Sequence, residues 1–298
     1  MKVVSGTSNI ALTKQIAQQL SVENIVAECS LFNNGEQRVW LNTKLAGETI
    51  VFVQSLSNPV DNHIMQLLLM VDAAEREGAK QIFLVIPWLG YSLQDKVFRP
   101  GEAIAAKVVA DLLSRPNIKR IFLVDLHSAS IPAFFSVPTT HLSVLDLFVE
   151  YARQNFVQTN CVVVSPDFGG IKRAQQFATA LQIPFANIDK RRDVVDGEVT
   201  AVAIHGEVKN KICLTYDDSI VSGGTAIETT QLLMQEGASQ VNLFATHAIF
   251  AQGSALILKE SGVNSIVTTN SVVQKEHDER IKIIDIAPML AKTILQFV

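Results

Sequence analysis

Cysteine is scarce in this chain, and no two cysteines are spaced to act together. The 298 residues include three, Cys29, Cys161 and Cys213, with no CxxC pair among them. A disulfide framework or a structural zinc site needs more cysteines at closer spacing. Their scarcity argues against both and favours a reducing compartment, so we expect a cytoplasmic protein.

Long apolar runs are missing as well. No stretch reaches the roughly 18 consecutive apolar residues of a membrane-spanning helix, and the start of the chain, residues 1–6, has no apolar stretch typical of a secretory signal. We therefore expect a protein that is neither exported nor inserted into a membrane.

An excess of positive charge is the third absence. Lys and Arg number 25 against 29 Asp and Glu, which gives a net charge of -4. Proteins whose main partner is nucleic acid gather Lys and Arg along the phosphate backbone, so nucleic acid is not the expected partner. With 48% hydrophobic and 18% charged residues, the composition is that of a globular chain. Its length suits two domains.

Short apolar runs rich in β-branched residues alternate with amphipathic stretches along the chain. The runs predict buried strands at residues 50–53, 82–86, 121–124, 162–164, 212–214 and 241–244. The stretches between them predict helices at residues 62–77, 102–113, 144–156 and 225–236. The expected fold class is α/β, with mostly parallel sheets flanked by helices.

The chain also repeats itself once. The sequence EGAKQI at residues 77–82 returns as EGASQV at residues 236–241, and both glycines suit the end of a helix. A chance match is the alternative for one short motif. Each copy, however, follows a strand, a loop and a helix in the same order, which favours two related halves. We expect domains at residues 1–142 and 143–298.

One segment of the second half has the parts of a sugar-phosphate site in order. In residues 211–225, KICLTYDDSIVSGGT, an apolar strand leads to two carboxylates, a glycine-rich turn and a helix. Backbone N–H groups, a helix N-terminus and hydroxyl groups together bind phosphate. The residues expected to do so are Val221, Ser222, Gly223, Gly224 and Thr225.

The carboxylates of that segment, Asp217 and Asp218, can accept hydrogen bonds from vicinal ribose hydroxyls, directly or through Mg²⁺. An acidic turn that caps a helix is the alternative reading of such a pair. The strand, the carboxylates, the hydroxyl and glycine turn and the helix in this order favour the site.

Residues 217–225 resemble the phosphoribosyl pyrophosphate loop of type I phosphoribosyltransferases and of ribose-phosphate pyrophosphokinases. Further blocks resemble the pyrophosphokinases in order, over essentially the whole chain; they are residues 32–36, 57–60, 90–95, 124–128, 165–170 and 189–192. The resemblance implies two tandem phosphoribosyltransferase-like domains. It also implies transfer of pyrophosphate from Mg-ATP to the C1 hydroxyl of ribose 5-phosphate, which gives phosphoribosyl pyrophosphate and AMP.

The resemblance assigns roles that the residues alone do not. ATP would be held by Phe32, Asn34, Gly35, Glu36, Gln94, Asp95 and Arg99. The metal ion, Mg²⁺, would be bound by His127 and Asp167, and catalysis would fall to Lys190 and Arg192. Family members assemble as dimers or hexamers, in which residues 32–36 reach a neighbouring subunit. Read without the family, these segments are a polar turn, solvated loops and a strand-end histidine.

Several positions depart from the family pattern. Leu93 stands in place of an arginine, Asn34 in place of an aspartate and Val221 in place of an acidic residue. These changes keep two alternatives open, a phosphoribosyltransferase and a non-catalytic regulatory homologue of the synthetase. The other expected site residues are all present, which favours the active enzyme.

Overall fold

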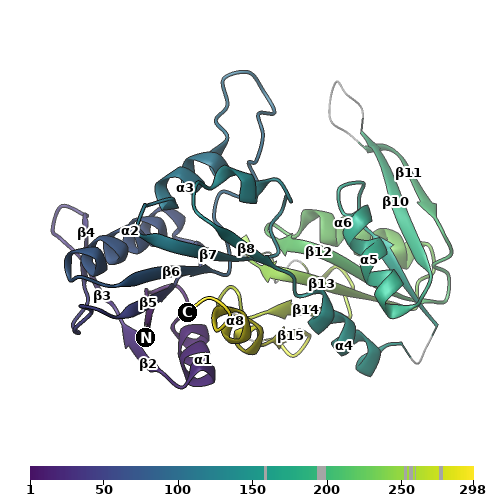
Figure 1. The fold of residues 1–298 in the computed structure, drawn as a ribbon. Helices are drawn as coiled ribbons and strands as arrows, with labels where there is room; N and C mark the ends of the chain where they lie inside the picture. The colour runs from purple at the N-terminus through teal and green to yellow at the C-terminus, as the bar shows by residue number, and fades with distance from the viewer. Residues whose placement is uncertain (158–159, 193–198, 252–253, 255–257, 259, 275–277) are drawn as a thin grey trace. The chain divides into compact units, whose positions relative to one another are not determined.

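The described residues form two compact units (Figure 1). The structure is a computed structural model, and it describes residues 1–157, 160–192, 199–251, 254, 258, 260–274 and 278–298, with the backbone alone for 190–192 and 199–202. Unit 1 consists of Met1–Ser143, Asn270–Val273 and Asp285–Val298, and unit 2 of Val144–Thr269 and Gln274–Ile284.

Unit 1 is built on a parallel sheet of six strands in the order β2-β1-β5-β6-β7-β8. The strands are β1 (Lys2–Ser5), β2 (Glu23–Val26), β5 (Thr49–Val53), β6 (Gln81–Ile86), β7 (Ile118–Val124) and β8 (Thr139–Leu142). Its helices are α1 (Ile10–Leu20), α2 (Val60–Arg76), α3 (Ala105–Leu113), the 3-10 helix η1 (Ile131–Phe134) and α8 (Ala287–Ile294). Figure 1 shows α2 and α3 on one face of this sheet and α1 and α8 on the other. Burial on both faces is why the central strands are apolar throughout.

Unit 2 has a sheet of seven strands in the order β11-β10-β9-β12-β13-β14-β15, parallel except between β10 and β11. The strands are β9 (Cys161–Ser165), β10 (Phe185–Arg192), β11 (Val199–His205), β12 (Ile212–Ile220), β13 (Gln240–Ala248), β14 (Ser265–Thr269) and β15 (Ile281–Ile284). Its helices include α4 (Leu145–Asn155), α5 (Ile171–Leu181) and α6 (Gly224–Gln235).

The predicted internal repeat is confirmed in atomic detail. Both sheets use one strand order, with β9, β10 and β12 in the places of β1, β2 and β5. At the two EGA turns, Gly78 and Gly237 have φ of +78° and +84°, which glycine adopts without strain. The carbonyl of Gly78 accepts from the N–H of Gly47, and that of Gly237 from Asn210, each at 2.8 Å.

All six predicted strands and all four predicted helices are present. Two boundaries differ for physical reasons. The helix expected from residue 102 begins at Ala105, because the Glu102 carboxylate accepts the N–H groups of Phe98 and Arg99 and closes a turn there. The strand expected at residues 212–214 continues to Ile220, paired along its length with β13.

The C-terminal segment belongs to unit 1 by its contacts. Helix α8 packs against α1, and Asn270 joins the two regions: its carbonyl accepts from Asn9 at 2.7 Å and its side chain donates to Gln15 at 3.1 Å. The first segment of unit 1 ends at Ser143, and residues 270–273 and 285–298 also belong to unit 1. The sequence had placed these two later segments in the C-terminal domain, residues 143–298. The domain limits themselves stay a prediction.

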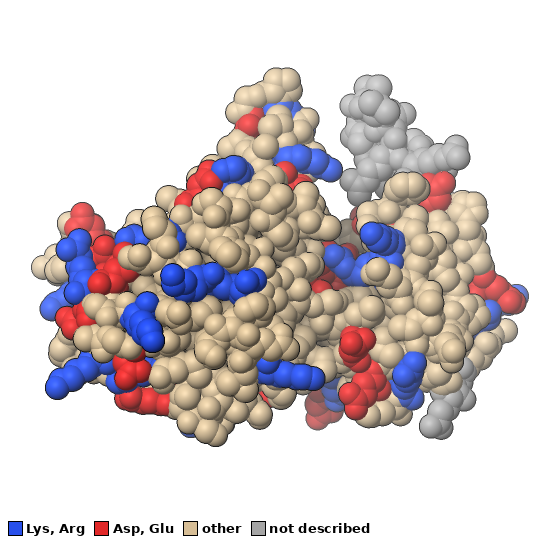
Figure 2. Space-filling model, in the orientation of Figure 1, with Lys and Arg blue, Asp and Glu red and all other residues tan. Residues whose placement is uncertain are grey.

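Charged side chains of both signs are scattered over the described part of the surface that Figure 2 shows, between larger areas of other residues. Lys and Arg lie among Asp and Glu there, without one continuous basic stripe. No described helix has both the length and the apolar character to cross a membrane.

Aromatic rings form one wall of the core of unit 2. Phe148 of α4 lies 5.4 Å from both Tyr216 of β12 and Phe244 of β13, and Phe177 of α5 lies 5.3 Å and 5.2 Å from the same two rings. The edge-to-face pairs among them add to the burial of apolar area. This cluster fixes β12 beneath α4 and α5.

We predict that Phe148→Ala lowers the free energy of unfolding by about 3 to 5 kcal/mol, because the fully buried ring leaves a cavity among its neighbours. Urea-induced unfolding followed by circular dichroism measures this. Phe168→Ala is the control, since Phe168 is 86% exposed and its loss should change stability by less than about 0.5 kcal/mol. Equal effects of the two changes would contradict the packing described.

Candidate active site

The two carboxylates of the predicted site are adjacent in strand β12, but only one of them faces the cavity. Side chains alternate along a strand, and Thr215, Asp217 and Ser219 all line one cavity. Asp218, between them, is not among the lining residues, and its side chain is only 5% exposed against 34% for Asp217. The site therefore offers one carboxylate to a ligand and holds the other within the protein.

Arg173 of α5 joins the two carboxylates. Its Nη1 lies 3.0 Å from Oδ1 of Asp217 and 2.6 Å from Oδ1 of Asp218. Asp218 also accepts from the hydroxyl of Ser219 at 3.3 Å, and Asp217 from the backbone N–H of Asp218 at 2.8 Å. A positive charge shared by two adjacent carboxylates reduces the repulsion between them.

The ionisation of these groups is shifted by their surroundings. Burial raises the pKa of Asp217 most, the neighbouring Asp218 carboxylate adds to the increase and Arg173 opposes it, so that the pKa moves from 3.8 to about 7. For Arg173, burial lowers the pKa, but the two carboxylates outweigh it and the net pKa is raised. Arg173 is thus held as a cation, whereas Asp217 can change its charge near neutral pH.

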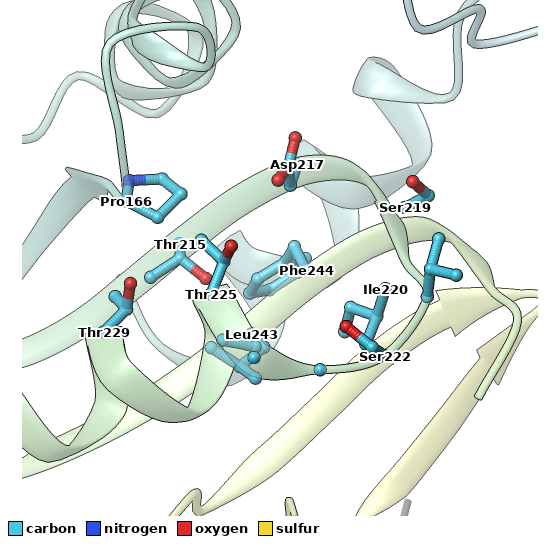
Figure 3. A pocket seen from close by; sticks show the side chains of 14 residues that line it. Pro166, Thr215, Asp217, Ser219, Ile220, Ser222, Thr225, Thr229, Leu243 and Phe244 are labelled. Carbon is cyan, nitrogen blue, oxygen red and sulfur yellow. The ribbon is translucent and has the colours of Figure 1, made fainter. Parts of the chain in front are cut away.

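A cavity of about 180 Å³ opens where β12 turns into α6 (Figure 3). Its lining includes Asp217 and all five residues of the predicted phosphate loop, Val221 to Thr225. The first N–H groups of α6 have no acceptor within the helix, and the helix dipole places partial positive charge beside them. The residues predicted to bind a sugar phosphate, except Asp218, are thus brought together around one cavity.

Two features fix the phosphate loop. Gly223 has φ of +80°, and a Cβ there would lie 3.2 Å from Cδ1 of Leu258, so the turn suits glycine. The carbonyl of Val221 accepts from the Ser254 hydroxyl at 3.1 Å and from the N–H of Ala251 at 2.9 Å. A loop held in this way is preorganised for an anion.

The residues expected to hold ATP all lie in unit 1, in two separate loops. Phe32, Asn34, Gly35 and Glu36 form the exposed turn of a hairpin between β3 (Glu28–Leu31) and β4 (Gln37–Trp40). Gln94, Asp95 and Arg99 lie in the loop between β6 and α3, which Figure 1 shows as a separate projection. The hairpin packs against α2. Their role in nucleotide binding stays a prediction.

The expected metal ligands lie in different units. His127 is exposed in the loop after β7 of unit 1. Asp167 follows β9 of unit 2, where its Oδ1 accepts the N–H of Gly170 at 2.9 Å and thereby shapes the turn into α5. Over the described ranges, no group of three or more His, Cys, Asp or Glu is placed to hold a metal ion. The metal site stays a prediction.

Lys190 and Arg192 lie at the end of β10, the strand next to the edge strand β11 of the unit 2 sheet. Their backbone pairs with β11, opposite Val202 and Val199. Their side chains are outside the part of the chain that the structure describes, so the catalytic role expected of them stays a prediction.

Comparison with known proteins places the chain in a family. Residues 1–116 match the model of the N-terminal domain of ribose phosphate pyrophosphokinase, and residues 194–297 match the phosphoribosyl synthetase-associated domain. The ribose-phosphate pyrophosphokinase of Aquifex aeolicus is 35% identical over 295 residues, with 99% of this chain and 94% of the relative covered. That of Fusobacterium nucleatum is 36% identical over 297 residues, with the same coverage.

The fold agrees as well. A crystal structure of phosphoribosylpyrophosphate synthetase from Mycobacterium smegmatis matches with a TM-score of 0.92 and 33% identity, covering 99% of this chain and 97% of that one. This chain belongs to the ribose-phosphate pyrophosphokinase family. The resemblance noted in the sequence is confirmed, and so is the two-part α/β fold. The chain is an enzyme of a transferase family of the kinase type.

Sequence reasoning missed Arg173, Thr215, Ser219 and Thr229. A signal existed for Arg173, the third residue of α5. The positive end of a helix dipole disfavours a cation in the first turn, so an arginine there indicates an acidic partner. Thr215 and Ser219 follow from alternation once β12 is known to continue to Ile220. Thr229 carries no local signal, because threonine inside a helix is ordinary.

We predict that Asp217→Asn changes how stability depends on pH. The folded pKa of Asp217, about 7, lies above its ordinary value of 3.8, so the folded state binds the proton more tightly than the unfolded state. The free energy of unfolding that this group contributes is therefore present at low pH and is lost as pH rises towards about 7. Asp217→Asn should gain stability relative to the unchanged protein between about pH 5 and about pH 8.

Urea midpoints at those two pH values measure the effect. Glu207→Gln is the control, because Glu207 is an exposed carboxylate paired with Lys211 on the surface. If the urea midpoints of Asp217→Asn and the unchanged protein differ by the same amount at both pH values, the raised pKa of Asp217 is refuted.

Proposed function

We propose that this enzyme transfers a pyrophosphoryl group from Mg-ATP to the C1 hydroxyl of ribose 5-phosphate, giving phosphoribosyl pyrophosphate and AMP. The observation that carries the proposal is the cavity of unit 2, which has an ionisable carboxylate at one end and a glycine and hydroxyl loop at a helix N-terminus at the other. Ribose 5-phosphate has hydroxyl donors that suit the carboxylate and a phosphate anion that suits the loop.

The phosphate end of the ligand would bind at the turn into α6. Its dianion would accept hydrogen bonds from the N–H groups of Gly224 and Thr225 and from the hydroxyls of Ser222 and Thr225. Val221 in place of an acidic residue removes a negative charge from this loop, which favours an anionic ligand.

The sugar end would bind at the carboxylates. Asp217, which faces the cavity, would accept hydrogen bonds from the ribose hydroxyls. Asp218 would act through its neighbours, since it is buried and holds Arg173 in place. Ionised Asp217 is the better acceptor, so ribose binding should strengthen as pH rises through about 7.

Mg²⁺ fits this arrangement as an ion that arrives with the nucleotide. It prefers oxygen ligands and retains waters and substrate phosphates in its coordination sphere, and Asp167 presents a carboxylate beside the cavity residue Pro166. His127 would be a further ligand, by the family resemblance. When bound, the ion neutralises charge on the phosphate oxygens.

In the proposed reaction, the C1 oxygen forms a bond to the β-phosphorus of ATP while the bond from that phosphorus to the bridging oxygen of AMP breaks. The C1 hydroxyl loses its proton, and AMP leaves with the bridging oxygen. Lys190 and Arg192 would stabilise the charge that develops on the transferred group. Phe32, Asn34, Gly35, Glu36, Gln94, Asp95 and Arg99 would orient the nucleotide.

We further propose that the enzyme acts as a homo-oligomer, a dimer or a hexamer, in which the turn at residues 32–36 completes the ATP site of a neighbouring subunit. Exposed Phe32, 50% accessible at the tip of the hairpin, suits a contact of this kind.

Release of AMP tests the proposed reaction. The purified protein with Mg²⁺, ATP and ribose 5-phosphate should form AMP and phosphoribosyl pyrophosphate in equal amounts, and omission of any one component should abolish both. Chromatography of the nucleotides provides the measurement. A phosphoribosyltransferase would form no AMP from this mixture, and a regulatory homologue would be inactive without a catalytic partner, so either result would exclude the proposal.

The role of Lys190 can be tested separately. Lys190→Ala should lower kcat by about 100-fold, the scale of one lost transition-state charge contact, while circular dichroism remains unchanged. Arg191→Ala removes one positive charge from the same strand and should have a much smaller effect, since the family resemblance gives Arg191 no role. Similar turnover in both variants would show that only the overall charge of β10 matters.

A further inference from the structure

Thr229 of α6 has a property that the proposed reaction leaves unexplained. Its side chain is completely buried, its Oγ1 has no hydrogen-bond partner among the residues that the structure describes, and the residue lies in the wall of the cavity. Buried hydroxyls are nearly always hydrogen-bonded, because an unpaired one has lost its bonds to water without replacement. In a cavity wall, such a group indicates a ligand atom as its partner.

The next residue provides an internal comparison. A threonine inside a helix can bond its hydroxyl to the carbonyl four residues earlier, and Thr230 does so, donating to the carbonyl of Ala226 at 2.7 Å. Thr230 is as fully buried as Thr229 and lies on the same turn. Neither burial nor the helix itself therefore accounts for the unpaired hydroxyl of Thr229.

Thr229 lies on the side of α6 that lines the cavity, in line with Thr225 of the phosphate loop. The residue lies one turn after Thr225, and the Cα–Cβ bond of a helical residue tilts towards the N-terminus. Figure 3 shows the Thr229 oxygen pointing the same way as the Thr225 oxygen. An anion bound at the start of α6 would accordingly meet both hydroxyls.

We propose that Thr229 is a further phosphate-binding residue, whose hydroxyl donates a hydrogen bond to the 5-phosphate of ribose 5-phosphate. This inference rests on the proposed function, which puts a phosphate monoester in the cavity. The apolar side chains of Leu243 and Phe244 form part of the same wall, so the bond is made where water competes little. Thr229 then discriminates against ribose without a phosphate, which leaves the buried hydroxyl unpaired.

Direct binding tests the inference without reference to turnover. Isothermal titration with inorganic phosphate and with ribose 5-phosphate should show about tenfold weaker binding of both to Thr229→Val, in which a methyl group replaces the hydroxyl at equal volume. Thr229→Ser keeps the hydroxyl and should bind both ligands as the unchanged protein does. Thr230→Val is the matched control and should also leave the affinities unchanged.

The stability of the two variants without ligand is a second test, because Thr229→Val and Thr230→Val should shift the urea midpoint in different directions. Thr229→Val removes an unpaired buried hydroxyl, so its urea midpoint should equal or exceed that of the unchanged protein. Thr230→Val removes a hydroxyl that is hydrogen-bonded, so its midpoint should fall. The midpoint increase caused by saturating phosphate should be smaller in Thr229→Val than in Thr230→Val.

Equal affinity of Thr229→Val and the unchanged protein for ribose 5-phosphate would overturn the inference and leave the proposed function standing. Equal weakening in Thr229→Val and Thr230→Val would also overturn it, because a loosened helix would explain both. Absence of AMP formation by the unchanged protein refutes the proposed function instead. Failure of the unchanged protein to bind either phosphate ligand would overturn both.

Discussion

The site of unit 2 depends on one ion cluster, in which Arg173 bridges Asp217 and Asp218. Two adjacent carboxylates in a buried strand repel each other, and burial disfavours their charged form. A guanidinium within 3.0 Å of both makes the pair tolerable inside the fold. The cation comes from the first turn of α5, against the dipole of its own helix, so its position is stabilised by the carboxylates and not by the helix. Strand, helix and cavity are tied together at this point.

The internal repeat shows what unit 1 has at the place of the ion cluster. Gln54 and Asp217 lie the same number of residues beyond Gly47 and Asn210, whose N–H groups make equivalent hydrogen bonds. Gln54 is fully buried, and its side chain accepts from the hydroxyl of Ser8 at 2.8 Å and donates to Gln66 at 3.1 Å. Unit 1 thus has a neutral amide network at the position where unit 2 has an ionisable carboxylate. The same backbone arrangement therefore supports a structural core in unit 1 and a charged cavity in unit 2.

Much of this architecture could be predicted from the sequence, for identifiable reasons. Central strands such as β5 and β12 are buried on both faces and leave continuous apolar runs. Edge strands such as β15, with the sequence IKII, are short and partly exposed, and they leave no such run. The phosphate turn was predictable because glycines and hydroxyls mark it locally. Arg173 was not predicted, since its partners Asp217 and Asp218 lie far along the sequence. Thr229 was not predicted, since only the folded structure shows that its hydroxyl is buried at the cavity.

The position of α8 has a consequence for how the protein is made. Ile16 and Leu20 of α1 form part of a buried face, and α1 packs against α8. On the ribosome, α1 is synthesised before unit 2, whereas α8 follows the whole of unit 2. The side of α1 that packs against α8 therefore stays uncovered until unit 2 has been synthesised. Unit 1 cannot complete its packing ahead of unit 2, and a nascent chain stopped at Ser143 would present that side to solvent and to chaperones.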